Sequence, residues 1–269
     1  MKLLKGTIMD KTPEDIELKI IQLYNDGFGT NEISTMWNVH RATVQRILLR
    51  NNIKLRKRSP VKYNVHFFDN YTIESCYWAG FIAADGTIRS DRDSVEMHLS
   101  KEDSSHLDKI AKATNFTGNI RVGEKDCCIS FAGEWFKKSL ENNFDLTSRK
   151  SMTVFVSDKI PKNMIPHYLR GYFDGDGCVS QTNNYLHISF TSGSKRFLNQ
   201  VIEIIYDLGI KVRNKSEKPK IQRYSIHYFC KNAYYVLKFL YESSTDLTRL
   251  NRKYLLYTDR ISEFELKTY

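Results

Sequence analysis

The chain has 269 residues and a net charge of +10, and 41% of its residues are hydrophobic. This length suits two or three folded units, and the hydrophobic content supports packed cores. No segment approaches the roughly 18 apolar residues of a membrane helix, and the first ten residues lack the apolar stretch of a signal peptide. The basic charge is compatible with a polyanionic partner such as nucleic acid.

The chain contains five cysteines, Cys76, Cys127, Cys128, Cys178 and Cys230. An odd count without a C-x-x-C spacing argues against a disulfide framework and against a zinc site. Reduced cysteines predict a location in the cytoplasm, or in a nucleoid or organellar matrix, and argue against secretion.

Residues 1–57 contain three helical patterns. Capping and acidic residues at 12–15 predict a helix start, and apolar residues then recur at helical spacing as far as Gly27. A short helix is expected over residues 30–37, and a third over 41–51 after a tight turn. Two helices joined by such a turn resemble the helix-turn-helix units of resolvases and many bacterial regulators.

The third predicted helix carries polar side chains on the face opposite its apolar residues. In the major groove of DNA, Arg reads guanine and Gln reads adenine. Residues 1–57 are therefore predicted to bind DNA, and the alternative is a three-helix bundle with solvated arginines. The predicted contacts of this unit are His40, Arg41, Gln45, Arg46 and Arg50.

A basic and polar stretch over residues 58–70 is expected to link this unit to the rest of the chain. Arg56 and Arg58 belong to a basic run that could lie along phosphates or in a minor groove. The alternative is a linker whose charges are only solvated.

The remaining chain contains a repeat. The segment 77–86 and the segment 168–177 both begin with Tyr, carry a Gly three residues later, and end in Asp-Gly. Each is followed by the same predicted order of strand, strand, helix, strand, strand and helix. The sequence thus predicts an α+β fold with two copies, over 71–160 and 161–269, related by a pseudo-twofold axis.

The repeated segments are apolar helices that end in an aspartate. Small residues along them would let the two helices approach closely, which would bring Asp85 and Asp176 together. Two adjacent carboxylates repel each other unless a cation lies between them, and Mg²⁺ is the obvious candidate. Such ions activate water and hold phosphates in phosphodiester hydrolysis.

Both segments resemble the motif of the LAGLIDADG homing endonucleases, at 78–86 and 169–177. The resemblance implies two αββαββα subdomains whose sheets form a saddle on DNA. It implies metal-dependent cleavage of both strands of a long asymmetric site, with short 3′ overhangs, as in intron or intein mobility. The first copy departs from the motif at Ala83, where many members have an acid, but that position does not bind the metal.

The same resemblance assigns the site residues. Asp85 and Asp176 would bind Mg²⁺ ions, for which Mn²⁺ could substitute, with help from the carbonyls of Ala84 and Gly175. Lys150 and Lys253 would match the family's basic residues, which lie near the scissile phosphates. Two copies in one chain suggest a monomer acting on double-stranded DNA.

Further DNA contacts are expected from the strands and their ends. Lys101 and Ser192, each at the end of a strand, could line the active-site pocket. The predicted DNA-binding side chains of this region are Arg89, Lys101, Arg121, Ser192, Lys211, Arg213, Lys215 and Arg223.

Two other functions remain open from the sequence. A DNA-binding regulator without catalysis would fit the N-terminal unit, although the intact pair of aspartates argues against it. An RNA maturase would fit the basic charge, and no other sequence feature tests it.

Overall fold

The structure is a computed structural model that describes residues 14–26, 28–55, 61–182, 185–210, 214–216, 223–259 and 261. The predicted contacts Arg56, Arg58, Lys211 and Arg213 lie outside the described residues, and for Lys215 only the backbone is described. The chain divides into two compact units, residues 1–60 and residues 61–269.

The first unit has three helices, α1 (Glu14–Asn25), α2 (Thr30–Met36) and α3 (Arg41–Arg50). Asn38 lies in the turn between α2 and α3 and adopts a left-handed conformation with φ of 49°, which asparagine tolerates. His40 caps α3, because its Nδ1 accepts a hydrogen bond from the backbone of Ala42 at 3.2 Å. The helices enclose a small core that contains Ile20, Tyr24, Ile33, Val44, Ile47 and Leu48.

The second unit begins earlier in the chain than the sequence predicts. Phe68 is fully buried, and the hydroxyl of Tyr63 donates to the carbonyl of Ala132 at 2.9 Å. Residues 61–70 therefore pack on the second unit, and the linker expected over 58–70 does not extend that far. Aromatic side chains in this polar stretch explain the difference, because they enter the core.

The second unit consists of two halves with the same order of elements. The first half contains α4 (Ile73–Asp85), β1 (Gly86–Ile88), β2 (Ser94–Ser100), η1 (Lys101–Asp103), α5 (Ser104–Ala113), β3 (Arg121–Val122), β4 (Asp126–Ala132), α6 (Glu134–Phe144) and α7 (Lys150–Thr153). The second half contains η2 (Lys162–Met164), α8 (Ile165–Asp176), β5 (Cys178–Thr182), β6 (Tyr185–Ser192), α9 (Lys195–Tyr206), β7 (Asn214–Ser216), β8 (Tyr224–Phe229), α10 (Cys230–Tyr241), η3 (Asp246–Thr248) and α11 (Asn251–Thr258).

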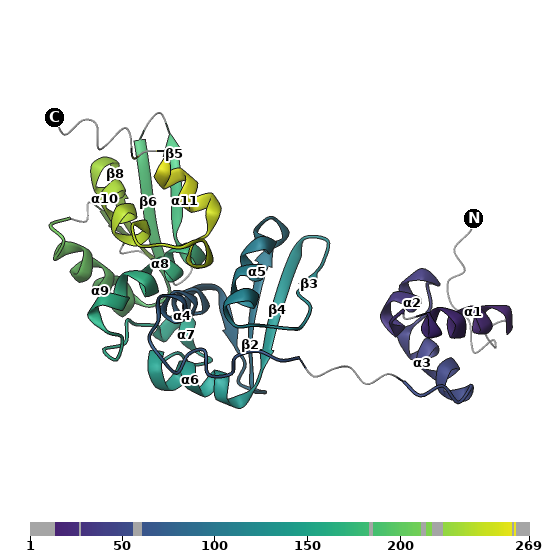
Figure 1. Ribbon diagram of the computed structural model, residues 1–269. Coiled ribbons are helices and arrows are strands. Elements are labelled where there is room, and N and C mark those ends of the chain that lie inside the picture. The colour runs from purple at the N-terminus through teal and green to yellow at the C-terminus, as the bar shows by residue number, and fades with distance from the viewer. Residues whose placement is uncertain are drawn as a thin grey trace. The chain divides into compact units, whose positions relative to one another are not determined.

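Both halves contain an antiparallel sheet with the same topology. The strand order is β1-β2-β4-β3 in the first half and β5-β6-β8-β7 in the second. The expected α+β fold with two like halves is thus confirmed. Figure 1 shows α4 and α8 next to each other, between the two sheets.

Helices α4 and α8 approach so closely that only glycine fits at the contact. A Cβ on Gly80 would lie 1.9 Å from the carbonyl oxygen of Tyr168, and a Cβ on Gly171 would lie 1.9 Å from that of Tyr77. Side chains at these positions would force the helices apart. The small residues expected from the sequence therefore set the spacing of the helix pair.

Helices pack against both sheets of the second unit. Helices α5 and α6 contact the first sheet, and α9 and α10 contact the second. Side chains alternate along a strand, so the residues between the buried ones lie on the other face. The buried strand residues that face the helices are Val95, Met97, Leu99, Ile129 and Phe131 in the first half and Leu186, Ile188, Phe190, Ile226 and Tyr228 in the second.

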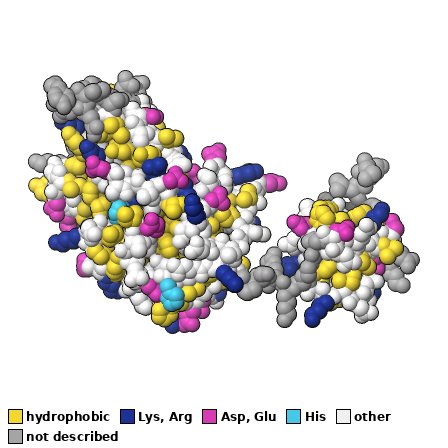
Figure 2. Space-filling view, in the orientation of Figure 1, with side chains coloured by type: hydrophobic (Ala, Val, Ile, Leu, Met, Phe, Trp, Pro, Cys, Tyr) yellow, Lys and Arg dark blue, Asp and Glu magenta, His cyan; other side chains and the backbone are white. Residues whose placement is uncertain are grey.

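On the face seen in Figure 2, Lys and Arg side chains are interspersed with Asp and Glu over residues 61–269. Across the described part of the chain, none of the helices has the length and apolar character needed to cross a membrane.

Candidate active site

Asp85 and Asp176 are the last residues of α4 and α8. Close to them, a Cβ on Gly175 would lie 2.5 Å from the Cβ of Ala84, so the two helix ends nearly touch. Both aspartate side chains are solvent-accessible. Even so, the surrounding protein and then Asp176 raise the pKa of Asp85, and the surrounding protein raises the pKa of Asp176. The helix ends thus hold two carboxylates in an environment that disfavours their charge.

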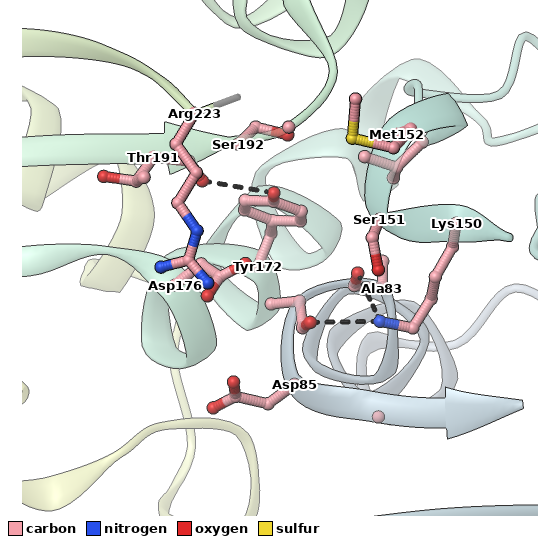
Figure 3. Close-up of a pocket in the computed structure, with 14 residues that line it drawn as sticks. Ala83, Asp85, Lys150, Ser151, Met152, Tyr172, Asp176, Thr191, Ser192 and Arg223 are labelled. Carbon is pink, nitrogen blue, oxygen red and sulfur yellow. Dashed lines mark hydrogen bonds between the residues drawn. The ribbon is translucent and has the colours of Figure 1, made fainter. Parts of the chain in front are cut away.

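A pocket of about 350 Å³ opens beside these carboxylates. Both halves of the second unit contribute to it, as Figure 3 shows. Its lining residues are Ala83, Ala84, Asp85, Gly86, Lys150, Ser151, Met152, Val154, Tyr172, Asp176, Thr191, Ser192, Gly193 and Arg223. The sequence-predicted residues Asp85, Asp176, Lys150, Ser192 and Arg223 therefore share one cavity.

Lys150 lies at the wall of this pocket and caps the end of α4. Its Nζ donates to the carbonyl of Ala83 at 2.9 Å and to that of Ala84 at 3.0 Å. Burial lowers the pKa of Lys150 to about 8, although Asp176 and Asp85 favour its charged form. The ammonium thus offsets the negative end of the α4 dipole.

Lys253 of α11 plays the same part at the end of α8. Its Nζ donates to the carbonyls of Phe173, Asp174 and Gly177 at 2.7, 2.8 and 2.6 Å. The side chain is 2% exposed, and burial lowers its pKa to about 8. Both lysines therefore bond to carbonyls of this chain, a placement that the sequence does not predict, and Lys253 is not among the residues that line the pocket.

Arg223 and Tyr172 are the other polar groups near Asp176. Arg223 lies beside the Asp176 carboxylate in Figure 3 and favours its charged form. The hydroxyl of Tyr172 donates to the carbonyl of Thr191 at 3.2 Å. Sequence reasoning missed Tyr172. The available signal was the contrast with Phe81, which stands at the same motif position in the first copy and has no hydroxyl.

Asp174 is a buried acid of the second motif that does not line the pocket. Its carboxylate accepts from the hydroxyls of Tyr77 and Tyr241 at 2.8 and 2.5 Å, and from the backbone N–H of Leu250 at 2.7 Å. Burial raises the pKa of Asp174, and Lys253 acts in the opposite direction. Asp174 thus ties α8 to α4 and α10. Ala83 holds the same motif position in the first copy. The acid at this position in the second copy therefore has a structural role and does not line the pocket.

The other predicted contacts lie outside the pocket, and several have partners within the chain. Arg50 bonds to Glu17. Arg89 pairs with Asp91 at 2.9 Å. Arg46 makes a 3.4 Å contact with the hydroxyl of Thr43. Arg41, Lys101 and Arg121 are exposed, and Gln45 is half-buried.

Across the described residues, no cluster of three or more His, Cys, Asp or Glu side chains could hold a metal ion. A cation at this site would therefore depend on the two aspartates together with backbone carbonyls. The carbonyl of Ala84 already accepts a hydrogen bond from Lys150. A carbonyl oxygen has two lone pairs, so one remains.

Comparison with known families identifies the fold. Residues 164–255 match the model of the LAGLIDADG-like domain, and residues 74–125 match the model of the WhiA LAGLIDADG-like domain. These matches cover the two motif helices and all the described strands of the second half, whereas the match in the first half ends before β4. The chain belongs to the LAGLIDADG family.

Several solved structures are similar to this chain. The meganuclease I-AabMI bound to uncleaved DNA is 15% identical, with a TM-score of 0.46 over 71% of this chain and 90% of its own. The homing endonuclease I-GzeII in complex with its DNA target is 13% identical, with a TM-score of 0.46 over 74% and 92%. The meganuclease I-SmaMI bound to uncleaveable DNA is 14% identical, with a TM-score of 0.44 over 68% and 86%.

One curated protein also matches. It is a glutamine–fructose-6-phosphate aminotransferase (isomerizing) of Methanocaldococcus jannaschii, 24% identical over 196 residues and 69% of this chain. The chain spans only 17% of the length of that relative.

Proposed function

We propose that this protein is a homing endonuclease that hydrolyses both strands of a long asymmetric duplex DNA site and leaves short 3′ overhangs. The observation that carries the proposal is the pair Asp85 and Asp176 at the touching ends of α4 and α8, in one pocket. Two like halves suit two antiparallel DNA strands, because a duplex has its own local twofold axis. A single chain with both halves would act as a monomer.

A divalent cation fits the aspartate pair. Burial and the charge of Asp176 raise the pKa of Asp85, so a bound cation would relieve an existing repulsion. Asp85, Asp176 and the carbonyls of Ala84 and Gly175 would hold Mg²⁺, or Mn²⁺ in its place. A bound ion of this kind supplies Lewis-acid activation of water and of the phosphate.

The chain's own residues have separate tasks in this proposal. Arg223 favours the ionised form of Asp176 and offers its guanidinium to the scissile phosphate. The ammonium groups of Lys150 and Lys253 fix the carbonyls at the helix ends and so position the aspartates. Ser192 and Tyr172 shape the polar wall opposite α7.

DNA binding is proposed for both units. Arg41, Gln45 and Arg46 on α3 would extend the target beyond the part read by residues 61–269. To contact DNA, Arg50 would have to break its ion pair with Glu17. The imidazole of His40 already accepts a hydrogen bond at the start of α3. The outer faces of the two sheets, with Lys101, Arg121 and Arg223 at their margins, would meet the duplex.

A second candidate function is a DNA-binding regulator that does not cut. Two observations favour it: the first half matches a model named for WhiA, and three helices with the predicted turn precede it. The retained aspartate pair favours cleavage.

A cleavage selection separates the two functions. The protein is incubated with a library of genomic duplex DNA, with Mg²⁺ and with EDTA, and the new ends are sequenced. Metal-dependent double-strand ends at one motif are expected. Asp85→Asn and Asp176→Asn should abolish these ends while the same DNA is still recovered by pull-down, and unchanged cutting by both variants would refute the mechanism. Recovery of one motif without any ends would favour the regulator.

A further inference from the structure

Two histidines lie side by side on the outer face of the sheet in the second half. His187 of β6 and His227 of β8 are joined by a contact of 3.0 Å between Nε2 and Nδ1. Their rings are nearly parallel, with an interplanar angle of 11°. The ring of Phe229 stacks beside His187, at 4.7 Å between centroids. Because their strand neighbours Ile188 and Ile226 are buried toward the helices, both imidazoles project from the opposite face.

A serine extends the contact at each end. The hydroxyl of Ser180 on β5 lies 3.1 Å from Nδ1 of His187. The hydroxyl of Ser225 on β8 lies 2.9 Å from Nε2 of His227. Ser180, His187, His227 and Ser225 thus form a continuous hydrogen-bonded row across three strands, which we call the histidine ladder. All four side chains are partly exposed.

The ladder has room for one additional proton. A protonated His187 donates from both nitrogens, to Ser180 and to His227, while His227 donates from Nε2 to Ser225. Every contact then has one donor and one acceptor. A second proton would place two N–H groups against each other across the 3.0 Å contact and break the row. The intact ladder can therefore take up one proton beyond its neutral state, and a second proton would break it.

That proton changes what the ladder offers to a ligand. When both serine oxygens accept from imidazoles, both serine hydroxyls are free to donate outward. The protonated ladder then presents one positive charge flanked by two donors, which complements a phosphate oxygen. The neutral row has only one outward donor and no charge.

The surroundings disfavour a proton on the free ladder. Burial and then His227 lower the pKa of His187, and burial lowers the pKa of His227. The described neighbours on the same face include Cys178 of β5 and Tyr185 of β6. The charged one is Arg223, which directly precedes β8 and lies beside Asp176 in the pocket. The helices pack on the other face, and the side chains of β7 lie outside the described residues. A phosphate placed over the ladder would reverse the balance, because a nearby anion favours the charged imidazole.

The first half has no such ladder. In the first half Gly86 pairs with Met97, and in the second half Cys178, which follows Gly177, pairs with Ser189. By this register Met97 is equivalent to Phe190, and Ser94 stands where the second half has His187. By strand pairing, Ser130 stands where it has His227. The feature therefore marks one half of a duplicated fold.

We propose that the histidine ladder is a proton-accepting contact for a DNA phosphate, so that the second half binds duplex DNA with uptake of one proton. The proposal rests on the DNA-binding function proposed above. It predicts that affinity rises as the pH falls, by at most about tenfold per pH unit, which is the limit for one linked proton.

Calorimetry in buffers of different ionisation enthalpy tests this directly. The full chain is titrated with random-sequence duplex DNA at low salt without Mg²⁺, at slightly acid pH and constant ionic strength. The observed enthalpy should vary with the buffer enthalpy with a slope of about one proton per complex. The double variant His187→Gln/His227→Gln should bind with a slope near zero, because glutamine keeps hydrogen-bonding groups but does not titrate. His66→Gln, which removes a histidine on the loop before α4, should leave the slope unchanged.

Nitrogen-15 NMR of the histidine rings gives a second readout that needs no variant. Addition of DNA should move one ladder histidine from neutral to protonated shifts. Wild-type binding without proton uptake, or equal uptake by the double variant, would overturn the proposal while leaving DNA binding intact. Failure of the wild type to bind any duplex would overturn the proposed function, and this inference with it.

Discussion

The two halves differ at a pair of equivalent positions inside the helix contact. In one direction, the hydroxyl of Tyr77 on α4 donates to the buried carboxylate of Asp174 on α8. In the other direction, the equivalent Tyr168 on α8 faces a helix with Ala83 in place of the acid. The Tyr168 hydroxyl is buried without a hydrogen-bond partner among the described residues. The same helix pair thus tolerates a polar network on one side and apolar packing on the other.

This difference separates the parts of the repeat that both copies share from the parts that only one copy has. The Asp-Gly ends and the contact glycines are the same in both copies, whereas the residues behind them have diverged. Variants that remove the side chains present in only one copy should therefore distinguish effects on folding stability from effects on DNA cleavage.

The largest effect is expected from Asp174→Ala. The change leaves the hydroxyls of Tyr77 and Tyr241 and the N–H of Leu250 without their buried acceptor. The free energy of unfolding should fall by about 3 to 5 kcal/mol, as measured by urea denaturation. Asp91→Ala removes an exposed carboxylate and should change it by less than about 0.5 kcal/mol. Similar losses for both variants would contradict the network.

An acid-sensitive contribution to stability is expected from His106. The ring is 1% exposed, and its Nε2 lies 2.9 Å from the hydroxyl of Tyr77. Burial lowers its pKa from 6.5 to about 3, so the folded state keeps it neutral where the unfolded state is protonated. Stability should therefore be fully present above pH 6.5 and decline below it, by about 1.4 kcal/mol per pH unit from this group.

The variant His106→Phe tests this, since Phe197 occupies the equivalent helix position in the second half. Thermal unfolding over the acid range should show a flatter pH dependence than the wild type. A residual slope is expected from His167, whose pKa burial lowers to about 4. An unchanged slope in His106→Phe would contradict the assignment.

The two capping lysines should differ in their contribution to stability. Lys253 donates three hydrogen bonds to carbonyls, and Lys150 donates two. Lys253→Met should lower the free energy of unfolding by about 3 kcal/mol and Lys150→Met by about 2 kcal/mol, with the loss arising from unsatisfied carbonyls. Chemical denaturation of the two variants in parallel gives the order, and the reverse order would be inconsistent with the caps.

The smallest effect concerns the order of strand cleavage. Tyr172 supplies a hydroxyl beside Asp176, and Phe81 supplies none at the equivalent position near Asp85. One neutral hydrogen bond is worth about 0.5 to 1.5 kcal/mol, so Tyr172→Phe should slow cleavage of one strand by about 2- to 10-fold. Duplexes labelled on either strand measure the two rates. A uniform slowing of both strands would argue against a strand-specific role.

The sequence predicts the parts of this molecule that depend on local pattern. The duplicated Asp-Gly helices, the strand order that follows them and the close approach at Gly80 and Gly171 are all visible in the repeat. Residues far apart in the chain are harder to place. The direction in which Lys150 and Lys253 donate depends on where the helix ends lie in space, and the pairing of His187 with His227 depends on strand register. Neither the lysine hydrogen bonds nor the histidine pairing produces a sequence pattern with a fixed spacing.

The reciprocal contact of Gly80 and Gly171 has a consequence for the origin of the chain. Gly80 faces the carbonyl oxygen of Tyr168, and Gly171 faces that of Tyr77. Each tyrosine stands three residues before the glycine of its own helix, so the contact is the same from either helix. Two identical chains related by a twofold axis make contacts of this isologous kind. The helix pair therefore has the geometry of a symmetric dimer interface within one chain, as a fusion of two copies would leave it. A gene split between residues 153 and 162 should yield fragments that reassociate through this contact.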